Sequence, residues 1–269
     1  MSDGEPLATV DYDLDDDGIA LITINQPAKR NAMTYPMIEQ MFAHLARAGG
    51  DPSCRVVILT GAGGAFCAGT DLDFLASIPA DQRGMRSPVT DEAGWWNIVA
   101  CPRPVIAAVD GTAVGMGAEW TSHCDVRIAT TRARFAWNFA QRGLVPDTGA
   151  GSWLLPRQVG LQRALRLLYS GDWLSAAEAL AIGYVIDVVA PERLLDAARD
   201  EARRYLTGGP QALRRIKQLV YGGTSRALGE HQFVSREQLQ QCFRSDEHAE
   251  GVAAFLEKRA PVFGDDAAG

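Results

Sequence analysis

The sequence predicts an α/β fold, in which a largely parallel sheet is followed by a helical C-terminal region. Three short apolar runs, at residues 55–60, 104–109 and 125–129, are each followed by glycine or polar residues. Such continuous runs are typical of strands buried on both faces of a sheet. Helical patterns separate and follow these runs, and strands that alternate with helices need crossover connections, which favours parallel pairing.

The N-terminal segment is expected to form two strands and a helix. Residues 8–12 and 19–24 read as β-strands separated by the turn-forming stretch DLDDDG. Thr34 then stands where a helix cap is expected. The apolar residues that follow recur at helical spacing and predict one buried stripe: Met37, Ile38, Met41, Phe42 and Leu45.

Helical patterns dominate the second half of the chain. They occupy residues 162–168, 175–181, 192–206, 210–219, 225–243 and 246–258. Because no linker-like stretch separates them from the strands, we predict a core over residues 1–200 and a dependent helical region over 201–269. This region is expected to pack on the core or on another subunit.

Composition excludes several classes of function. The net charge of −7 argues against a nucleic-acid surface, and no apolar run reaches the ~18 residues that span a bilayer. An acidic N-terminus without an apolar segment predicts no signal peptide, and five scattered cysteines without a CxxC pair suit reduced thiols in a cytoplasm. Four histidines without HxxxH spacing predict no metal and are expected to be structural or exposed.

Two glycine-rich loops follow predicted strands, and they read GAGGAFCAGTDL and DGTAVGMGAEW. Ligands of parallel sheets bind beyond the carboxyl ends of the strands, where such loops let the backbone approach closely. Neither loop has the spacing of a dinucleotide fingerprint. Two loops of this kind can instead aim two backbone N–H groups at one oxygen, as an oxyanion hole does.

Glu119 lies three residues beyond Met116 in the second loop. On a helix that begins near Gly115, these two residues share a face. The carboxylate is therefore predicted to face a carbonyl group held at Met116. The alternative is that Glu119 forms a buried ion pair with Arg127 or Arg142.

Several ordered motifs resemble the crotonase superfamily of enoyl-CoA hydratases and isomerases. They are TGAGGAFCAGTDL, PVIAAVDGTAVGMGAEW with HCDVRIA, and GLVPDTGAGSWLLPRQVG, and the similarity extends from NQPAKRNAM to DEHAEGVAAFLEKRAPVF. The resemblance implies a spiral of ββα turns with a helical C-terminal region, assembled as a homotrimer or a dimer of trimers. It also implies an acyl-CoA thioester substrate of fatty-acid or aromatic-acid breakdown, with coenzyme A as part of the substrate and no separate cofactor.

The resemblance also assigns site residues by position. Oxyanion-hole amides are expected at Ala68 and Met116, and the first catalytic carboxylate at Glu119. Contacts with coenzyme A are expected from Lys29, Arg30, Ala32 and Lys258. Other substrate contacts are expected from Gly69, Thr70, Asp71, Gly115, Trp137 and Phe139.

The second carboxylate departs from the hydratase pattern. Phe139 stands where a hydratase has its second catalytic glutamate, whereas Asp147 matches an aspartate that several isomerases and a dehalogenase of the superfamily use. Because a phenyl ring cannot hold the water that hydration needs, the sequence favours isomerisation over hydration. An aspartate behind Leu144, Val145 and Pro146 is expected to be partly desolvated, with a raised pKa.

Plainer interpretations stay open for three of these points. Asp71 is expected to cap the helix that follows it, and Asp147 has equal claim to capping a helix through Trp153. The alternative functions are enoyl-CoA hydratase proper, or a catalytically silent scaffold or RNA-binding relative. The acidic balance and the retained Glu119 favour an enzyme.

Overall fold

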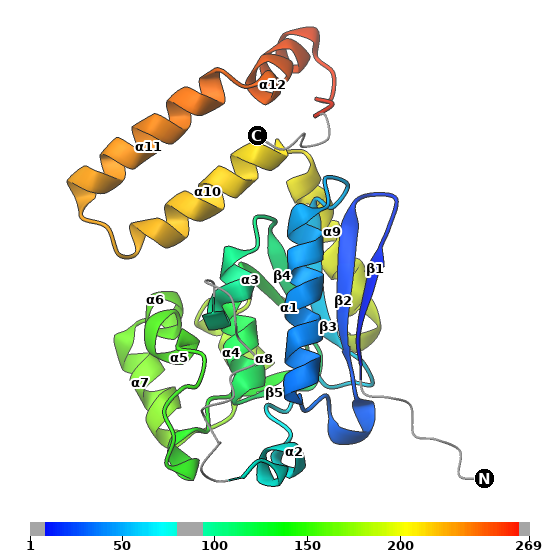
Figure 1. The fold of residues 1–269 in the computed structure, drawn as a ribbon, viewed down its shortest axis with the longest axis vertical. Coiled ribbons are helices and arrows are strands. Elements are labelled where there is room, and N and C mark those ends of the chain that lie inside the picture. Colours follow the sequence, from blue (N-terminus) through cyan, green and yellow to red (C-terminus); the bar gives the residue numbers. More distant parts are fainter. Residues whose placement is uncertain (1–8, 80–93, 264–269) are drawn as a thin grey trace.

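The computed structural model describes residues 9–79 and 94–263, and two sheets organise them (Figure 1). The main sheet has the order β1-β2-β3-β4-β6-β9, antiparallel at β1 and β2 and parallel elsewhere. A smaller sheet has the order β5-β7-β8. The strands are β1 (Thr9–Leu14), β2 (Ile19–Asn25), β3 (Val56–Gly61), β4 (Val105–Val109), β5 (Thr112–Val114), β6 (Val126–Thr130), β7 (Arg134–Ala136), β8 (Leu174–Ser175) and β9 (Asp187–Val189).

Helices cover the main sheet and then extend beyond it. The α-helices are α1 (Tyr35–Gly50), α2 (Leu72–Ser77), α3 (Asn97–Ala100), α4 (Met116–His123), α5 (Ala150–Trp153), α6 (Leu155–Val159), α7 (Leu161–Ser170), α8 (Ala176–Ala181), α9 (Leu194–Leu206), α10 (Pro210–Gly223), α11 (Leu228–Phe243) and α12 (Asp246–Glu257). Short 3₁₀ helices are η1 (Pro27–Lys29), η3 (Gly94–Trp96), η4 (Ala140–Arg142) and η5 (Pro191–Arg193). The predicted α/β class is confirmed. Ala8, which the sequence places in the first strand, lies outside the described residues.

The main sheet is buried on both faces, as its continuous apolar strands predict. Successive residues of β3 enter different apolar clusters: Val57 and Leu59 pack with α1, and Val56 and Ile58 pack with α9. In α1 the predicted stripe is buried, and Thr34 is the N-cap residue, although its side chain makes no capping hydrogen bond. The helix is therefore held by packing rather than by its cap.

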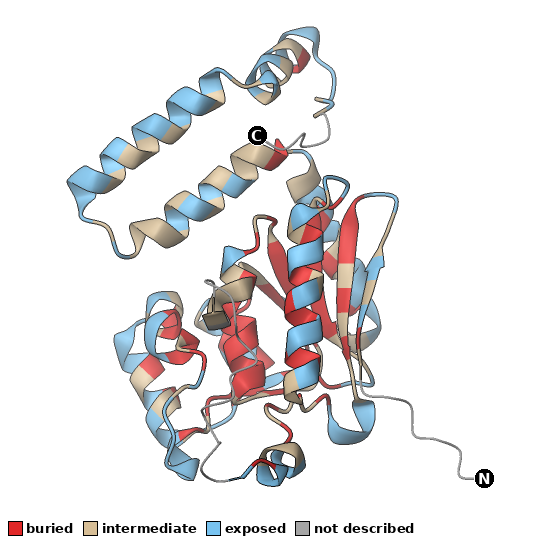
Figure 2. Cartoon of the chain, in the orientation of Figure 1, coloured by how far each residue is buried: buried red, intermediate tan, exposed pale blue. Residues whose placement is uncertain are grey.

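Helix α4 lies inside the molecule, and Figure 2 shows it buried along its length. All eight of its residues are buried, polar ones included. It begins directly after β5 at Gly115, whose φ of +55° suits glycine. The sequence-based expectation of a helix starting near Gly115 is confirmed, and it places Glu119 in the interior.

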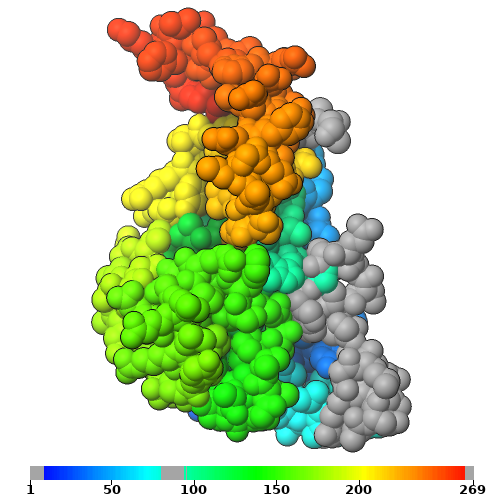
Figure 3. All heavy atoms as spheres, turned by 90° about the vertical axis from the view of Figure 1, so that its left-hand side faces the viewer, coloured from blue at the N-terminus to red at the C-terminus, as the bar shows by residue number. Residues whose placement is uncertain are grey.

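Residues 210–263 form a C-terminal arm that stands off the core (Figure 3). The predicted boundary at residue 200 falls inside α9, which packs on the sheet, whereas the arm begins with α10. The described part of α11 contains no buried residue. A cavity of about 400 Å³ is lined both by residues of the arm and by residues 99–102 at the end of α3.

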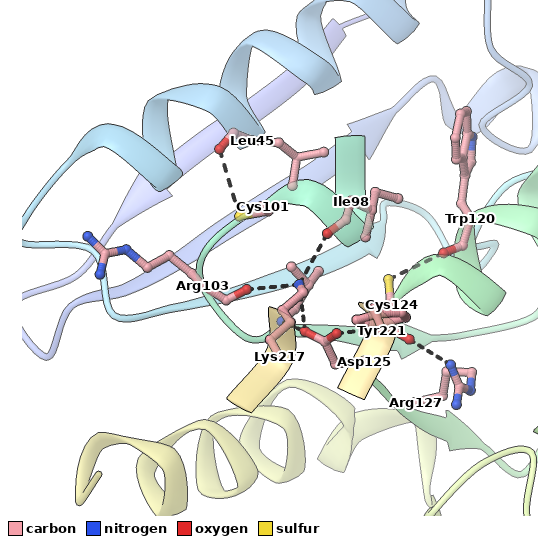
Figure 4. Close-up of polar contacts among 11 residues, drawn as sticks. Leu45, Ile98, Cys101, Arg103, Trp120, Cys124, Asp125, Arg127, Lys217 and Tyr221 are labelled. Atoms are coloured by element: carbon pink, nitrogen blue, oxygen red, sulfur yellow. Dashed lines mark hydrogen bonds and ion pairs between the residues drawn. The ribbon is translucent and has the colours of Figure 1, made fainter. Parts of the chain in front are cut away.

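One lysine fastens the arm to the core (Figure 4). Lys217 of α10 donates to the carbonyl oxygens of Ile98 and Arg103 at 3.2 and 3.1 Å, and to Asp125 at 2.9 Å. The other oxygen of Asp125 accepts from the Tyr221 hydroxyl at 2.9 Å. Since Asp125 directly follows the C-cap of α4, the anchor joins the arm to the end of that helix.

Among the residues that the structure describes, no helix has both the length and the apolar character needed to cross a membrane.

Candidate active site

The two glycine-rich loops touch beyond the carboxyl ends of β3 and β4. A Cβ at Gly117 would lie 2.2 Å from the carbonyl oxygen of Cys67, and a Cβ at Gly69 would lie 3.7 Å from the amide nitrogen of Met116. Gly69 also has a φ of +95°. Only glycine permits this approach, so the loops converge as their composition predicts.

The Met116 amide is available for a ligand. Met116 is the first residue of α4, where an N–H has no partner within the helix, and none of the described residues accepts from it. The helix N-terminus also carries partial positive charge. This amide is therefore oriented and charged to receive a developing oxyanion.

The Ala68 amide, the predicted second donor, is occupied. It donates to the carbonyl oxygen of Arg30 at 3.0 Å. The Thr70 amide has no hydrogen-bond acceptor among the described residues. Thr70 forms an isolated parallel bridge with Met33, but the two hydrogen bonds of this bridge join Met33 to Gly69 and to Asp71. A residue in such a bridge turns its own N–H to the opposite side. The Thr70 hydroxyl lies 3.9 Å from the sulfur of Met116, so this side faces the start of α4.

Glu119 is fully buried one turn along α4. Its Oε2 accepts a hydrogen bond of 2.9 Å from the Thr148 hydroxyl, and its Oε1 has no hydrogen-bond partner among the described residues. A Cβ at Gly151 would lie 2.6 Å from Oε1, so the absence of a side chain there makes room for the carboxyl group. One carboxyl oxygen is thus fixed and the other is left unpaired.

Burial raises the pKa of Glu119 to about 7, while the nearby Gly151 amide and the Thr148 hydroxyl oppose the rise. In the described parts of the chain no cation pairs with Glu119. Arg127 donates to the carbonyl oxygens of Tyr184, Thr121 and Cys124, and Arg142 donates to that of Asn138. The ion-pair interpretation therefore finds no support, and the carboxyl group is poised for proton transfer near neutral pH.

Asp147 lies in the loop before α5, directly before the Thr148 whose hydroxyl group holds Glu119. The charge of its carboxylate is a minor cause of the raised pKa of both Glu119 and Cys67, for which burial is the main cause. Surrounding protein atoms raise the pKa of Asp147 itself to about 6, although the residue stays accessible to solvent. Gly149, not Asp147, is the N-cap of α5, so the capping interpretation is wrong.

Phe139 lies beside the start of α4, whereas Trp137 lies deeper in the apolar core. The Phe139 ring is 6% exposed, and its Cζ lies 4.0 Å from the position of a Cβ at Gly115, beside the start of α4. Trp137 is fully enclosed and packs edge-on against Tyr184 with 5.4 Å between ring centroids. Phe139 therefore borders the site, and Trp137 supports it from the core.

Asp71 caps α2, as expected. Its carboxyl oxygen accepts from the amides of Asp73 and Phe74 at 3.0 and 3.1 Å. The other oxygen receives the ammonium group of Lys29 at 2.7 Å, and Lys29 also contacts Asp73 at 3.1 Å. The charge of Lys29 is thus partly neutralised where the sequence places a coenzyme A contact.

The other predicted coenzyme A contacts are divided between distant segments. Arg30 is exposed, with a left-handed φ of 51°, and Ala32 follows it in the loop after η1. Lys258 is the exposed C-cap of α12 in the arm. Figure 1 places the loop after β2 and the helix α12 at opposite ends of the molecule. A single chain therefore does not bring Lys258 to the other three residues.

Sequence reasoning missed three residues near Glu119. Thr148 holds the carboxyl group, and the Trp96 ring lies 3.7 Å from the position of a Cβ at Gly149. His123 is buried one turn beyond Glu119. Only His123 left a signal, because its position follows Met116 and Glu119 at helical spacing. Among the described residues no three His, Cys, Asp or Glu side chains converge as metal ligands.

The chain is similar to known proteins over nearly its whole length. Residues 15–266 match the family described as enoyl-CoA hydratase/isomerase. The chain is 36% identical over 249 residues to 1,2-epoxyphenylacetyl-CoA isomerase of Escherichia coli K12, covering 91% of this chain and 95% of the relative. It is 34% identical over 246 residues to crotonyl-CoA hydratase of Syntrophomonas wolfei, covering 91% and 94%. A solved enoyl-CoA hydratase of Bacillus anthracis superposes with a TM-score of 0.89 at 31% identity, covering 96% and 99%.

Proposed function

Because the chain belongs to the enoyl-CoA hydratase/isomerase family, we propose that it moves a double bond within the acyl group of an acyl-CoA thioester. The observation that carries the preference for isomerisation is Phe139. Its apolar ring borders the start of α4 where a hydratase would need a second carboxylate to hold water. Relatives are named both hydratase and isomerase, so the choice between the reactions rests on this residue.

The thioester carbonyl binds at the start of α4 in this proposal. The Met116 amide donates from the helix N-terminus, and the free Thr70 amide is the better second donor. Ala68 serves only if its bond to Arg30 breaks. Donors fixed before the reaction stabilise the enolate oxygen without reorganisation, and this stabilisation lowers the barrier to removing the α-proton.

Asp147 carries the proton. Its carboxyl group is accessible, and a pKa of about 6 leaves it mostly ionised at neutral pH yet basic enough to remove an activated proton. It takes the proton from the α-carbon of a 3-enoyl thioester and returns it at the γ-carbon, so the double bond enters conjugation. Glu119, with its pKa of about 7, holds a proton part of the time and hydrogen-bonds the enolate.

Coenzyme A is proposed to lie along the loop after η1, as part of the substrate. Arg30 and Ala32 lie there, and Lys29 holds the acidic cap of α2. Since Lys258 lies at the opposite end of the chain, it reaches a nucleotide only in a neighbouring subunit (Figure 1). Assembly therefore completes the binding site.

The arm supplies the surface for this assembly, which we propose is a homotrimer or a dimer of trimers. A lone chain leaves large apolar side chains of the arm in water: Ile216, Val220, Phe233, Leu239, Phe243, Phe255 and Leu256. Apolar surface of this extent is typical of protein interfaces. The five unpaired cysteines support a cytoplasmic setting, and neither a nucleic acid nor a membrane is a proposed partner.

Two substrates test the reaction. Crotonyl-CoA and a 3-enoyl-CoA are each incubated with the protein while the absorbance of the conjugated thioester is followed. Gain of absorbance with the 3-enoyl substrate supports isomerisation, and loss with crotonyl-CoA supports hydration instead. Silence with both, despite measurable binding, favours the catalytically inactive scaffold.

A further inference from the structure

A stripe of three residues runs along one face of α4. Met116, Glu119 and His123 stand at positions i, i+3 and i+7, which lie above one another on a helix. Met116 marks the proposed carbonyl site, and Glu119 is the proposed hydrogen-bond donor to the enolate. His123 is the next residue of this face along the helix.

His123 is an unpaired polar group in the interior. It is fully buried, and neither ring nitrogen has a hydrogen-bond partner among the described residues. Its ring packs between Trp96 and Trp120, with centroid separations of 5.0 and 5.8 Å. Burial lowers the pKa of His123 to about 3, so the imidazole is neutral and offers one donor and one acceptor.

Packing alone does not explain why a histidine with two unpaired ring nitrogens occupies this position. Leaving a buried donor and acceptor unsatisfied costs free energy, and an apolar side chain of similar size would avoid that cost. Residues that lower stability in this way are expected at functional sites. The unpaired nitrogens therefore call for a partner that arrives with a ligand.

Trp96 connects His123 to the reaction site. Its Cζ2 lies 3.7 Å from the position of a Cβ at Gly149, next to the Thr148 that holds Glu119. Trp96 is only half-buried, so part of this residue is open to solvent. A planar ring in the acyl group can stack against this indole, as aromatic rings prefer to do.

We propose that His123 is a specificity-determining residue that hydrogen-bonds an oxygen substituent at the far end of a ring-bearing acyl group. The seven-position step from Met116 to His123 corresponds to about 10 Å along the helix axis, comparable with the length of a hydroxylated 4-phenylbutenoyl group. The ring lies beside Trp96, whose side chain turns aside to uncover the imidazole. This inference rests on the proposed function, because it extends the same acyl site.

Binding of two matched thioesters tests the proposal. The dissociation constants of 4-phenylbut-2-enoyl-CoA and 4-(4-hydroxyphenyl)but-2-enoyl-CoA are measured by calorimetry on the intact protein and on His123→Met. The unsubstituted protein is expected to bind the hydroxylated ligand at least about tenfold more tightly, because an unmatched polar site rejects the analogue that lacks the hydroxyl group. His123→Met is expected to bind both equally and to have an unchanged or higher Tm.

Further outcomes separate this inference from the proposed function. His123→Asn keeps a donor and an acceptor, so it should retain part of the preference. Equal affinities in the unsubstituted protein, or a preference that survives His123→Met, would overturn the role of His123 and leave an internal water as its partner. Failure of both ligands and of crotonyl-CoA to bind would instead count against the acyl-CoA site itself.

Discussion

Helix α4 and the C-terminal arm leave opposite kinds of groups without partners. Helix α4 encloses polar atoms, and Oε1 of Glu119 and both nitrogens of His123 lack hydrogen bonds among the described residues. The arm exposes apolar side chains, and Phe255 is 81% accessible. Buried unpaired polar atoms point to a substrate, whereas exposed apolar side chains point to another protein surface. Groups without partners thus indicate a small ligand at α4 and a second subunit at the arm.

Asp147→Asn gives the strongest test of the polar side of this comparison. The amide cannot accept the substrate proton, so isomerase turnover should fall about 10³-fold with little change in thioester binding. Turnover of the 3-enoyl-CoA and calorimetric affinity measure the two effects. The exposed Asp172 provides a matched control as Asp172→Asn. Unchanged turnover would remove Asp147 from the reaction.

Lys217→Met breaks the link between the two regions. It leaves the partly buried Asp125 without its cation, which should cost about 3 kcal/mol of stability and release the arm. Urea unfolding and limited proteolysis within residues 210–263 report these changes. Lys258→Met, at the exposed end of α12, should change neither. Equal behaviour of the two variants would show that packing alone holds the arm.

Glu119→Gln tests how the buried carboxyl group makes the free energy of unfolding depend on pH. The folded state raises the pKa of Glu119 from 4.5 to about 7, so folding favours the protonated form. Stability from this group is therefore complete below pH 4.5, falls between pH 4.5 and 7, and stays lower above pH 7. Since glutamine does not ionise, the stability of the variant relative to the unsubstituted protein should rise by up to ~3 kcal/mol across that interval.

Urea unfolding at several pH values from 4 to 8 measures this difference for Glu119→Gln. A difference that does not vary with pH would show that Glu119 titrates alike in both states. The same variant should also turn over the 3-enoyl substrate more slowly, because a glutamine amide is a weaker hydrogen-bond donor to the enolate than a carboxylic acid. These two effects are independent, so each checks a different part of the assignment.

Phe255→Ser tests the apolar side of the comparison with the smallest effect on one chain. The ring is exposed, so the free energy of unfolding of the monomer should change by less than about 0.5 kcal/mol. The oligomer of the variant should nevertheless associate more weakly, so that it persists only at higher protein concentrations than the unsubstituted oligomer. Light scattering measures this difference. Gln232→Ser on α11 is a matched exposed control. Equal masses for the two variants at every concentration would place the interface elsewhere.

The sequence predicts most of the framework because apolar periodicity and glycine placement are local signals. The stripe of α1, the buried strand β3 and the start of α4 at Gly115 follow from them. The small sheet is not predictable in this way, because β5 and β7 have three residues each and β8, which pairs with β7, has two. Short strands acquire their identity from their partners rather than from their own pattern.

The site also combines features that local sequence patterns predict with features that depend on the tertiary structure. Glu119 and Met116 share a face by helical spacing, so their relation is fixed by the chain itself. The choice between the Ala68 and Thr70 amides depends on the bridge with Met33, more than thirty residues away. His123 carries a readable spacing, but its burial against Trp96 depends on the tertiary structure.

The anchor of the arm also has a consequence for the order of folding. The three acceptors of Lys217 come from α3, the turn before β4 and the junction of α4 with β6. They are close together only after those segments have assembled, and α10 leaves the ribosome after all of them. The arm therefore docks late, and its apolar surface becomes available for subunit assembly on a core that has already formed.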